Sequence, residues 1–168
     1  FFEERKADPR YDNVKTAALS RIAAKKGISG EKALALFNSD NYDSDGDGVS
    51  NLIERAFGGD SLGNDSRANR PAPVKASDGK EYLSFTRYSS DYQTDMGIKY
   101  IVERSTDRRT WSSSDIKVYN DNNESWNTYD PENSTTGKDL GGGMERVVYR
   151  TTAATSAGTT QFIRVRVK

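Results

Sequence analysis

Residues 43–54, with the sequence DSDGDGVSNLIE, constrain the fold of this chain more than any other segment. Oxygen-bearing side chains recur at positions 1, 3, 5, 9 and 12 of these twelve residues, and Gly48 occupies position 6, where such a loop turns sharply. This is the spacing of an EF-hand-like loop, which surrounds Ca²⁺ with six to eight oxygens. The predicted Ca²⁺ ligands are Asp43, Asp45, Asp47, the main-chain carbonyl of Val49, Asn51 and Glu54.

Helical patterns flank this loop. A first helix is predicted between a capping Asp12 or Asn13 and Gly27, and a second after Ser29. A third is predicted over residues 52–57, which completes the helix–loop–helix layout. Residues 1–58 are therefore expected to form a helical segment around one calcium loop.

The loop is expected to be single and static. Position 8, which is usually apolar and joins two loops into a pair, is Ser50, and the chain has no second complete loop. Asp60, Asn64 and Asp65 follow in a glycine-rich stretch. The preferred interpretation is a polar turn. The alternative is that these residues add ligands to the first ion or bind a second one.

Composition narrows the function classes. The 168 residues include 25 Lys and Arg and 25 Asp and Glu, so the formal net charge is zero and long-range attraction to nucleic acid or an anionic membrane is not expected. The chain has no Cys and no His, which removes thiol and imidazole chemistry. Carboxylate-pair chemistry remains, but no catalytic motif is recognisable, so the chain is predicted not to be an enzyme.

No apolar run approaches eighteen residues, so membrane insertion is not expected. The first residues, FFEERKADPR, contain no apolar signal core. The chain is therefore expected to be cytosolic, or a mature or excised piece of a longer precursor.

From residue 81 onward the hydrophobic period changes from helical spacing to alternation, which is typical of half-buried strands. Residues 59–80, rich in Gly and Pro, are predicted to be a connector, and 120–143 a polar surface loop with a short hairpin around Trp126 and Tyr129. An antiparallel β-sandwich is predicted over 81–168. Its alternating runs are 81–88, 98–105, 115–119, 145–151 and 161–168.

Several aromatic and basic side chains of this region invite a prediction of exposure. Trp111 is expected to fold back onto one end of the core, because it follows a turn between two strands. The better candidates for exposure have polar neighbours: Trp126, Tyr129, Tyr88 and Tyr92. The basic side chains of the last strand, Arg164, Arg166 and Lys168, are expected to form its solvated face.

Residues 40–168 resemble a known module. The segments DSDGDGVSNLIERAFGGD, DGKEYLSFTR, IKYIVERSTDRRTW, GGGMERVVYR and QFIRVRVK are similar to the C-terminal regions of large secreted or surface proteins of Verrucomicrobia and Planctomycetes. There, a thrombospondin-type-3-like calcium motif precedes a small β domain. The resemblance implies a sandwich fold and an extracellular, noncatalytic accessory module, and implies no defined ligand beyond calcium.

Three function classes follow from these patterns. The first is a calcium-stabilised structural or adhesion module of an extracellular or cell-surface protein, whose partner is another protein or a polysaccharide. The second is a carbohydrate-binding module of a secreted polysaccharide-degrading enzyme, which would need an exposed aromatic platform. The third is a subunit of an extracellular filament.

Overall fold

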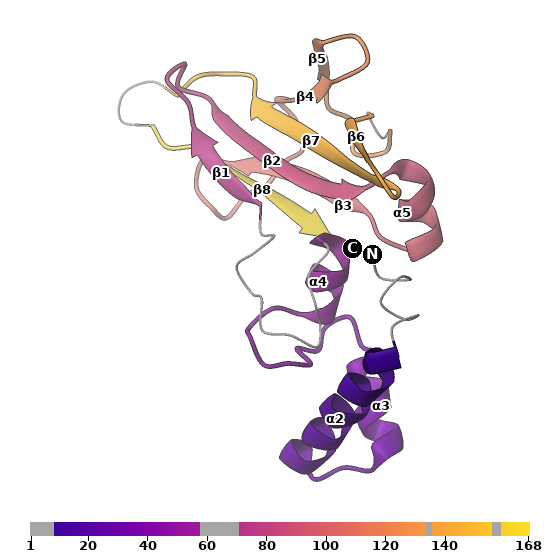
Figure 1. Ribbon diagram of the computed structural model, residues 1–168. Helices are drawn as coiled ribbons and strands as arrows, with labels where there is room; N and C mark the ends of the chain where they lie inside the picture. The colour runs from indigo at the N-terminus through magenta and orange to yellow at the C-terminus, as the bar shows by residue number, and fades with distance from the viewer. Residues whose placement is uncertain (1–8, 58–70, 134–135, 156–158) are drawn as a thin grey trace. The chain divides into compact units, whose positions relative to one another are not determined.

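The computed structural model describes residues 9–57, 71–133, 136–155 and 159–168 (Figure 1). The chain divides into two compact units, Phe1–Arg70 and Pro71–Lys168. The border between them falls inside the segment 59–80 that the sequence predicts as a connector. Each unit has its own core, so each is described by itself.

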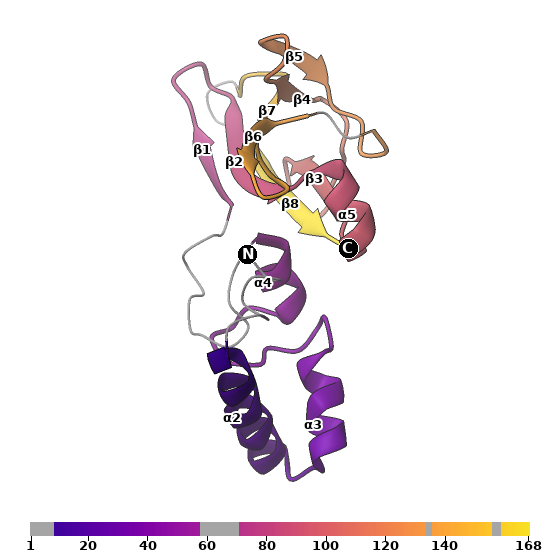
Figure 2. The same cartoon turned by 45° about the vertical axis from the view of Figure 1, so that its right-hand side comes forward.

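The described residues of the N-terminal unit form three helices, as predicted: α2 (Pro9–Lys26), α3 (Gly30–Phe37) and α4 (Asn51–Phe57). Helix α2 begins three residues before the predicted cap, at a proline whose fixed φ suits the first helical position. It ends at Gly27, whose φ of 64° is left-handed. Figure 2 shows α2 and α3 side by side, and the side chains buried between them are Ala18, Ile22, Ala33 and Phe37.

The C-terminal unit is mainly antiparallel β-structure, as predicted. One sheet has the strand order β1-β2-β7-β4-β5, with β6 paired to β7, and a second sheet contains β3 and β8. The strands are β1 (Ala72–Lys75), β2 (Glu81–Tyr88), β3 (Tyr100–Ser105), β4 (Ile116–Asn120), β5 (Ser125–Thr128), β6 (Lys138–Gly141), β7 (Met144–Thr151) and β8 (Phe162–Val167).

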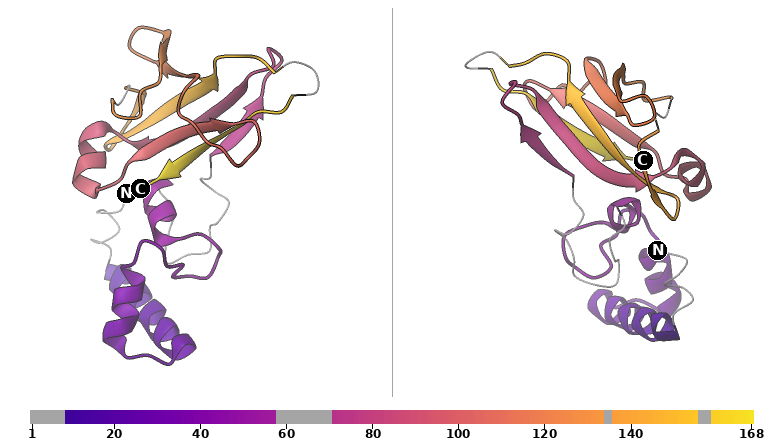
Figure 3. Two further views of the ribbon diagram at one scale, coloured as in Figure 1. Left: turned by 180° about the vertical axis from the view of Figure 1, so that it is seen from behind. Right: turned by 45° about the horizontal axis from the view of Figure 1, so that its top comes forward.

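Aromatic side chains join the two sheets. The Phe85 ring on β2 lies with its centroid 5.9 Å from that of Tyr100 on β3 and 5.8 Å from that of Tyr149 on β7. The hydroxyl oxygen of Tyr129 accepts a hydrogen bond from the Val102 amide at 3.1 Å. Figure 3 shows β3 and β8 lying against one face of the larger sheet. The core of this unit therefore sits between that face and the β3–β8 pair.

A buried ion pair spans β2 and β7. The Nε of Arg87 donates to the Oε1 of Glu145 at 2.8 Å, and the Arg87 Nη1 donates to the Tyr149 hydroxyl at 2.9 Å. The other Glu145 oxygen accepts the Gly137 amide at 2.8 Å. Both charged side chains are almost fully buried, at 3% and 6% exposed, so this pair is satisfied within the protein.

Three elements differ from the sequence prediction. Strand β1 lies within the expected connector and pairs with β2. Helix α5 (Ser90–Met96) was not predicted, because its residues are polar and none of them is buried. The segment 120–143 was predicted as a loop with one hairpin. It contains β5 with Trp126, but β5 pairs with β4, which lies almost entirely before this segment, and the C-terminal part of the segment contains β6 as well.

The aromatic predictions were partly wrong. Tyr88 and Tyr129 were expected to be exposed, but each is only 9% exposed, and the Tyr129 ring packs edge-on against that of Tyr149 in the core. Tyr92 is exposed as predicted. Trp126 and Trp111 are half-buried, each beneath an arginine, Arg150 and Arg164 respectively.

Candidate metal site

The segment between α3 and α4 is closed at its base by main-chain hydrogen bonds. The amide of Asn51 donates to the Tyr42 carbonyl at 2.8 Å, and the amide of Leu52 donates to the Asp40 carbonyl at 3.0 Å. An ion pair between Arg55 and Asp40, 2.7 Å, joins the same two ends. The start of α4 is thereby held beside the start of the loop, so the residues between them form a closed turn.

Asp43 organises the turn itself. Its carboxylate accepts the amides of Gly46 at 2.7 Å, Gly48 at 2.9 Å and Asp47 at 3.2 Å. Gly46 and Gly48 have φ values of 85° and 91°, a left-handed backbone that favours glycine. The two glycines thus let the chain wrap around one carboxylate.

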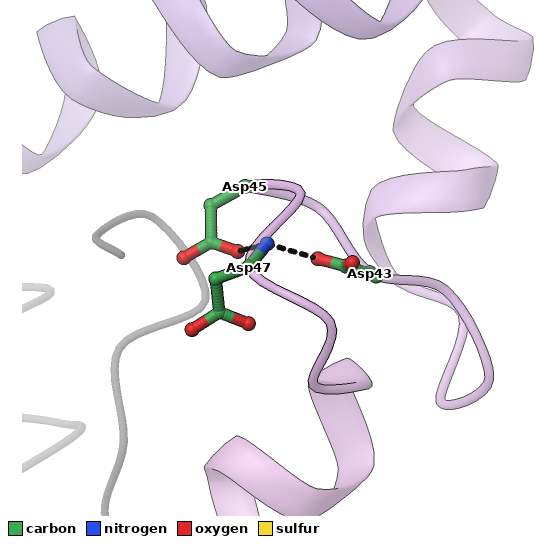
Figure 4. A group of neighbouring side chains, drawn as sticks. All are labelled: Asp43, Asp45 and Asp47. Atoms are coloured by element: carbon green, nitrogen blue, oxygen red, sulfur yellow. Dashed lines mark hydrogen bonds between the residues drawn. The ribbon is translucent and has the colours of Figure 1, made fainter. Parts of the chain in front are cut away.

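Asp43, Asp45 and Asp47 gather their carboxylates at the centre of this turn (Figure 4). One carboxylate oxygen from each lies within 4.8 Å of the other two. All three side chains are half-buried, and the Oδ2 atoms of Asp45 and Asp47 are buried without a hydrogen-bond partner. Buried anionic oxygens that lack donors are costly, and a hard cation among them would satisfy both. The three carboxylates could therefore hold a metal ion.

The electrostatics of the triad agree with this geometry. Burial, together with the neighbouring charges of Asp47 and Asp43, raises the pKa of Asp45 to about 6. Burial opposes ionisation of Asp43 too, but amide hydrogen bonds from Gly48 and Gly46 lower its pKa. At neutral pH the turn therefore concentrates negative charge, which a cation would neutralise.

The structure gives the other predicted ligands different surroundings. Asn51 is buried, and its Nδ2 donates to the carbonyls of Phe37 at 2.7 Å and Ser39 at 2.9 Å. Its Oδ1 accepts the Ser44 amide at 3.3 Å. The Asn51 side chain therefore ties the end of α3 to the loop, a contact across fourteen residues that no periodic sequence pattern could signal.

Val49 and Glu54 are also buried, at 6% and 3% exposed. Glu54 lies outside the group of carboxylates within 4.8 Å of one another, which among the described residues consists of the three aspartates. Asp60, Asn64 and Asp65, considered above for a second ion, lie outside the described residues. The structure thus brings together three of the four predicted carboxylate ligands.

The C-terminal unit has a separate cleft of about 480 Å³ between α5 and the turn at 129–133. Charged side chains line it, but they have partners within the protein. Arg87 pairs with Glu145 at 2.8 Å, and Lys99 pairs with Glu132 at 2.7 Å. Asp130 accepts the Glu132 amide at 2.9 Å, and this bond contributes to a lowered Asp130 pKa.

Comparison of the chain with known protein families, with curated proteins and with solved structures gave no match. None of the helices in the described part of the chain is long and apolar enough to cross a membrane.

Proposed function

We propose that this chain is a noncatalytic, calcium-stabilised accessory module of an extracellular or cell-surface protein. Ca²⁺ would bind in the loop 43–54, held by Asp43, Asp45 and Asp47, with further oxygens from the Val49 carbonyl, Asn51 and Glu54. The observation that carries the proposal is the close approach of three carboxylates, two of which, those of Asp45 and Asp47, each have a buried oxygen without a hydrogen-bond partner.

The donor chemistry favours Ca²⁺ over other cations. The candidate ligands are all oxygens, and the chain contains no Cys or His for a softer metal. Mg²⁺ demands near-ideal octahedral geometry and keeps several of its waters, whereas Ca²⁺ accepts irregular shells of six to eight oxygens. A twelve-residue turn with three aspartates suits the more permissive ion.

The ion would have a static role. The loop ends are already held by main-chain hydrogen bonds and by the side-chain amide of Asn51, and Val49 within the loop is buried. A lone loop with Ser50 at position 8 lacks the partner that sensor loops use for opening. Ca²⁺ would then stabilise the helical unit rather than switch it.

In this proposal the C-terminal unit is a small β-sandwich that presents the module to its partner. Extracellular loops of this type bind Ca²⁺ with dissociation constants of roughly 0.1–1 mM, which matches calcium outside cells. A dissociation constant near or below about 0.1 μM, measured by calorimetry, would argue for an intracellular protein instead.

Unfolding with and without the ion tests the metal site. A hundredfold excess of Ca²⁺ over the dissociation constant should stabilise the N-terminal unit by about 2.7 kcal/mol. The far-UV helical signal reports mainly on that unit, whereas both tryptophans, Trp111 and Trp126, lie in the C-terminal unit. Chelation should therefore lower the unfolding midpoint measured by the helical signal and leave the midpoint measured by tryptophan fluorescence nearly unchanged.

Asp45→Asn and Asp47→Asn should abolish the calcium effect, because each keeps the side-chain shape and removes a charge. Asp121→Asn, at an exposed position of the other unit, is the matched control and should retain it. Identical helical unfolding curves in calcium and in chelator would refute the proposal.

A further inference from the structure

The strands of the six-stranded sheet carry charged side chains of a single sign on their outward face. In the C-terminal unit as a whole, residues 71–168 contain 14 basic and 13 acidic residues, which is nearly balanced. Strand alternation points Leu83, Phe85, Val147 and Tyr149 into the core, so their neighbours in the strands point outward. The charged strand residues on this outward face are all basic: Lys117, Lys138, Arg146 and Arg150. One acidic group, Asp78 in the turn between β1 and β2, borders the face, and its carboxylate accepts a hydrogen bond from the Tyr82 hydroxyl at 3.0 Å.

Three aromatic side chains cluster on the same face. The centroid of the Trp126 ring lies 5.3 Å from that of Tyr119 and 5.9 Å from that of Tyr82, and both contacts are edge-on. The Arg150 guanidinium stacks 4.0 Å from the centroid of Trp126, and its Nη1 donates to the Tyr82 hydroxyl at 3.4 Å. The Arg150 Nε is buried without a hydrogen-bond partner. All four of these side chains are half-buried, which holds them firmly while leaving part of each accessible.

Hydroxyl and aliphatic groups complete this surface. Thr128 lies opposite Lys117 in the register, and its hydroxyl accepts the Lys117 ammonium at 3.0 Å. Ser84 is exposed beside Val148, and Val74, opposite Tyr82, is 63% exposed. We call the surface of Tyr82, Lys117, Tyr119, Trp126, Arg146 and Arg150 the basic aromatic face.

We propose that the basic aromatic face binds an anionic polysaccharide, one whose sugars carry carboxylates. Aromatic rings offer flat apolar surface with a polar edge, which suits the C–H face of a sugar ring. Guanidinium groups pair with carboxylates in a planar, bidentate manner, so Arg146 and Arg150 supply charge complementarity. Ser84 and Thr128 can hydrogen-bond sugar hydroxyls.

A polysaccharide is favoured over a nucleic acid by the charge of the whole chain. Nucleic-acid binding draws most of its affinity from neutralised phosphates and requires a strongly basic protein surface. Here the formal net charge is zero, and the basic aromatic face contributes three positive charges, from Lys117, Arg146 and Arg150. A polymer with fewer charges and more hydroxyl groups matches this surface better.

This site goes beyond the proposed calcium function and does not depend on it. Its residues all belong to the C-terminal unit, whereas the acidic triad belongs to the N-terminal unit. Loss of calcium stabilisation and loss of polysaccharide binding can therefore be observed separately in the same protein.

Titration calorimetry of the full chain with hyaluronate, a uronate-bearing polymer, tests the proposal at low ionic strength. Dextran serves as the neutral polymer and a single-stranded oligonucleotide as the phosphate polymer. We expect binding of hyaluronate that weakens with salt, and much weaker binding of the other two. Arg150→Gln and Trp126→Ala should each weaken hyaluronate binding by at least about tenfold.

The other sheet provides matched controls. Arg164 stacks on Trp111 with a separation of 3.8 Å, so Arg164→Gln and Trp111→Ala remove the same groups from a different surface and should leave binding unchanged. If Trp126→Ala fails to fold, Arg146→Gln at an exposed position should still weaken binding severalfold. Absence of hyaluronate binding, equal losses in both sets of variants, or tighter binding of the oligonucleotide would overturn the proposal.

Discussion

The two units of this protein hold their carboxylates in opposite ways. In the C-terminal unit, Glu145 is almost fully buried, yet it receives hydrogen bonds from Arg87 and from the Gly137 amide. In the N-terminal unit, Asp43, Asp45 and Asp47 share a half-buried turn with one another. The first arrangement is neutral without any added ion, and the second concentrates like charges.

This difference separates two routes to a stable fold. A buried ion pair contributes little by itself but is costly to break, because the remaining charge has no water around it. A cluster of like charges opposes folding until a cation joins it, and its contribution then depends on the concentration of that cation. The stability of the C-terminal unit should therefore not depend on calcium, whereas the stability of the N-terminal unit should increase when calcium is added.

The largest effect should follow from breaking the buried pair. Arg87→Met keeps the apolar length of the side chain but leaves the Glu145 carboxylate without its cation. The free energy of unfolding of the C-terminal unit should fall by about 3–5 kcal/mol. Urea unfolding followed by tryptophan fluorescence measures this loss, in calcium and in chelator alike. Arg109→Met at an exposed position should change stability little, and a similar small change for Arg87→Met would contradict the comparison.

A smaller effect should distinguish two roles for Asn51. Asn51→Asp keeps an oxygen for the ion and removes the Nδ2 donor to Phe37 and Ser39. If the amide secures the loop, stability should fall by about 1–3 kcal/mol even in excess calcium, because two buried carbonyls lose their donor. The measurement is urea unfolding by the helical signal, with Asn41→Asp as the exposed control for the added charge. Unchanged stability with equal or tighter calcium binding would show that Asn51 acts as a ligand.

The smallest effect concerns pH and the β3–β8 pair. Burial alone would raise the pKa of Glu103, but hydrogen bonds from Arg166 at 2.9 Å and Arg164 at 2.8 Å lower it overall. A depressed pKa stabilises the fold above the unfolded value of about 4.3, and this contribution disappears as pH falls through the folded value. Because both arginines are about two-fifths exposed, we expect less than about 1 kcal/mol.

Fluorescence-detected unfolding of Glu103→Gln between pH 3 and pH 7 checks this expectation. In Glu103→Gln the free energy of unfolding should fall less steeply as the pH is lowered than in the parent protein. Glu132→Gln, whose exposed carboxylate pairs with Lys99, should show the same pH dependence as the parent. An identical acid slope in the parent and in Glu103→Gln would show that the two arginines contribute nothing.

Sequence reasoning succeeded where a periodic pattern met a core. The alternation of Leu83 and Phe85 with polar residues located β2, and Gly27 and Ser29 separated the first two helices. Helix α5 was missed because its residues bury nothing. The sequence did not show that Trp126 would be half-buried and Tyr129 buried. Both residues have polar neighbours, and the face that each occupies depends on how β5 pairs with β4.

The candidate site was predictable to the extent that it is local. The aspartates at positions 1, 3 and 5 converge because two left-handed glycines turn the chain between and after them. The role of Asn51 depends on the carbonyls of Phe37 and Ser39, whose location follows from how α3 ends. Such a side chain to main chain contact is a property of the folded unit and has no counterpart in residue spacing.

Strand β1 has a consequence for how this protein behaves at high concentration. It forms an edge of the six-stranded sheet, and open edges invite pairing between molecules. The Ala76 amide donates to the Lys80 carbonyl, so it points toward β2. Because backbone amides alternate in direction along a strand, the nitrogens of Pro73 and Lys75 point away from β2, toward the open side. Proline has no hydrogen to donate there, and lysine adds charge. Pro73, part of the proline-containing stretch that hid this strand from sequence reasoning, thus also disfavours pairing between molecules at this edge.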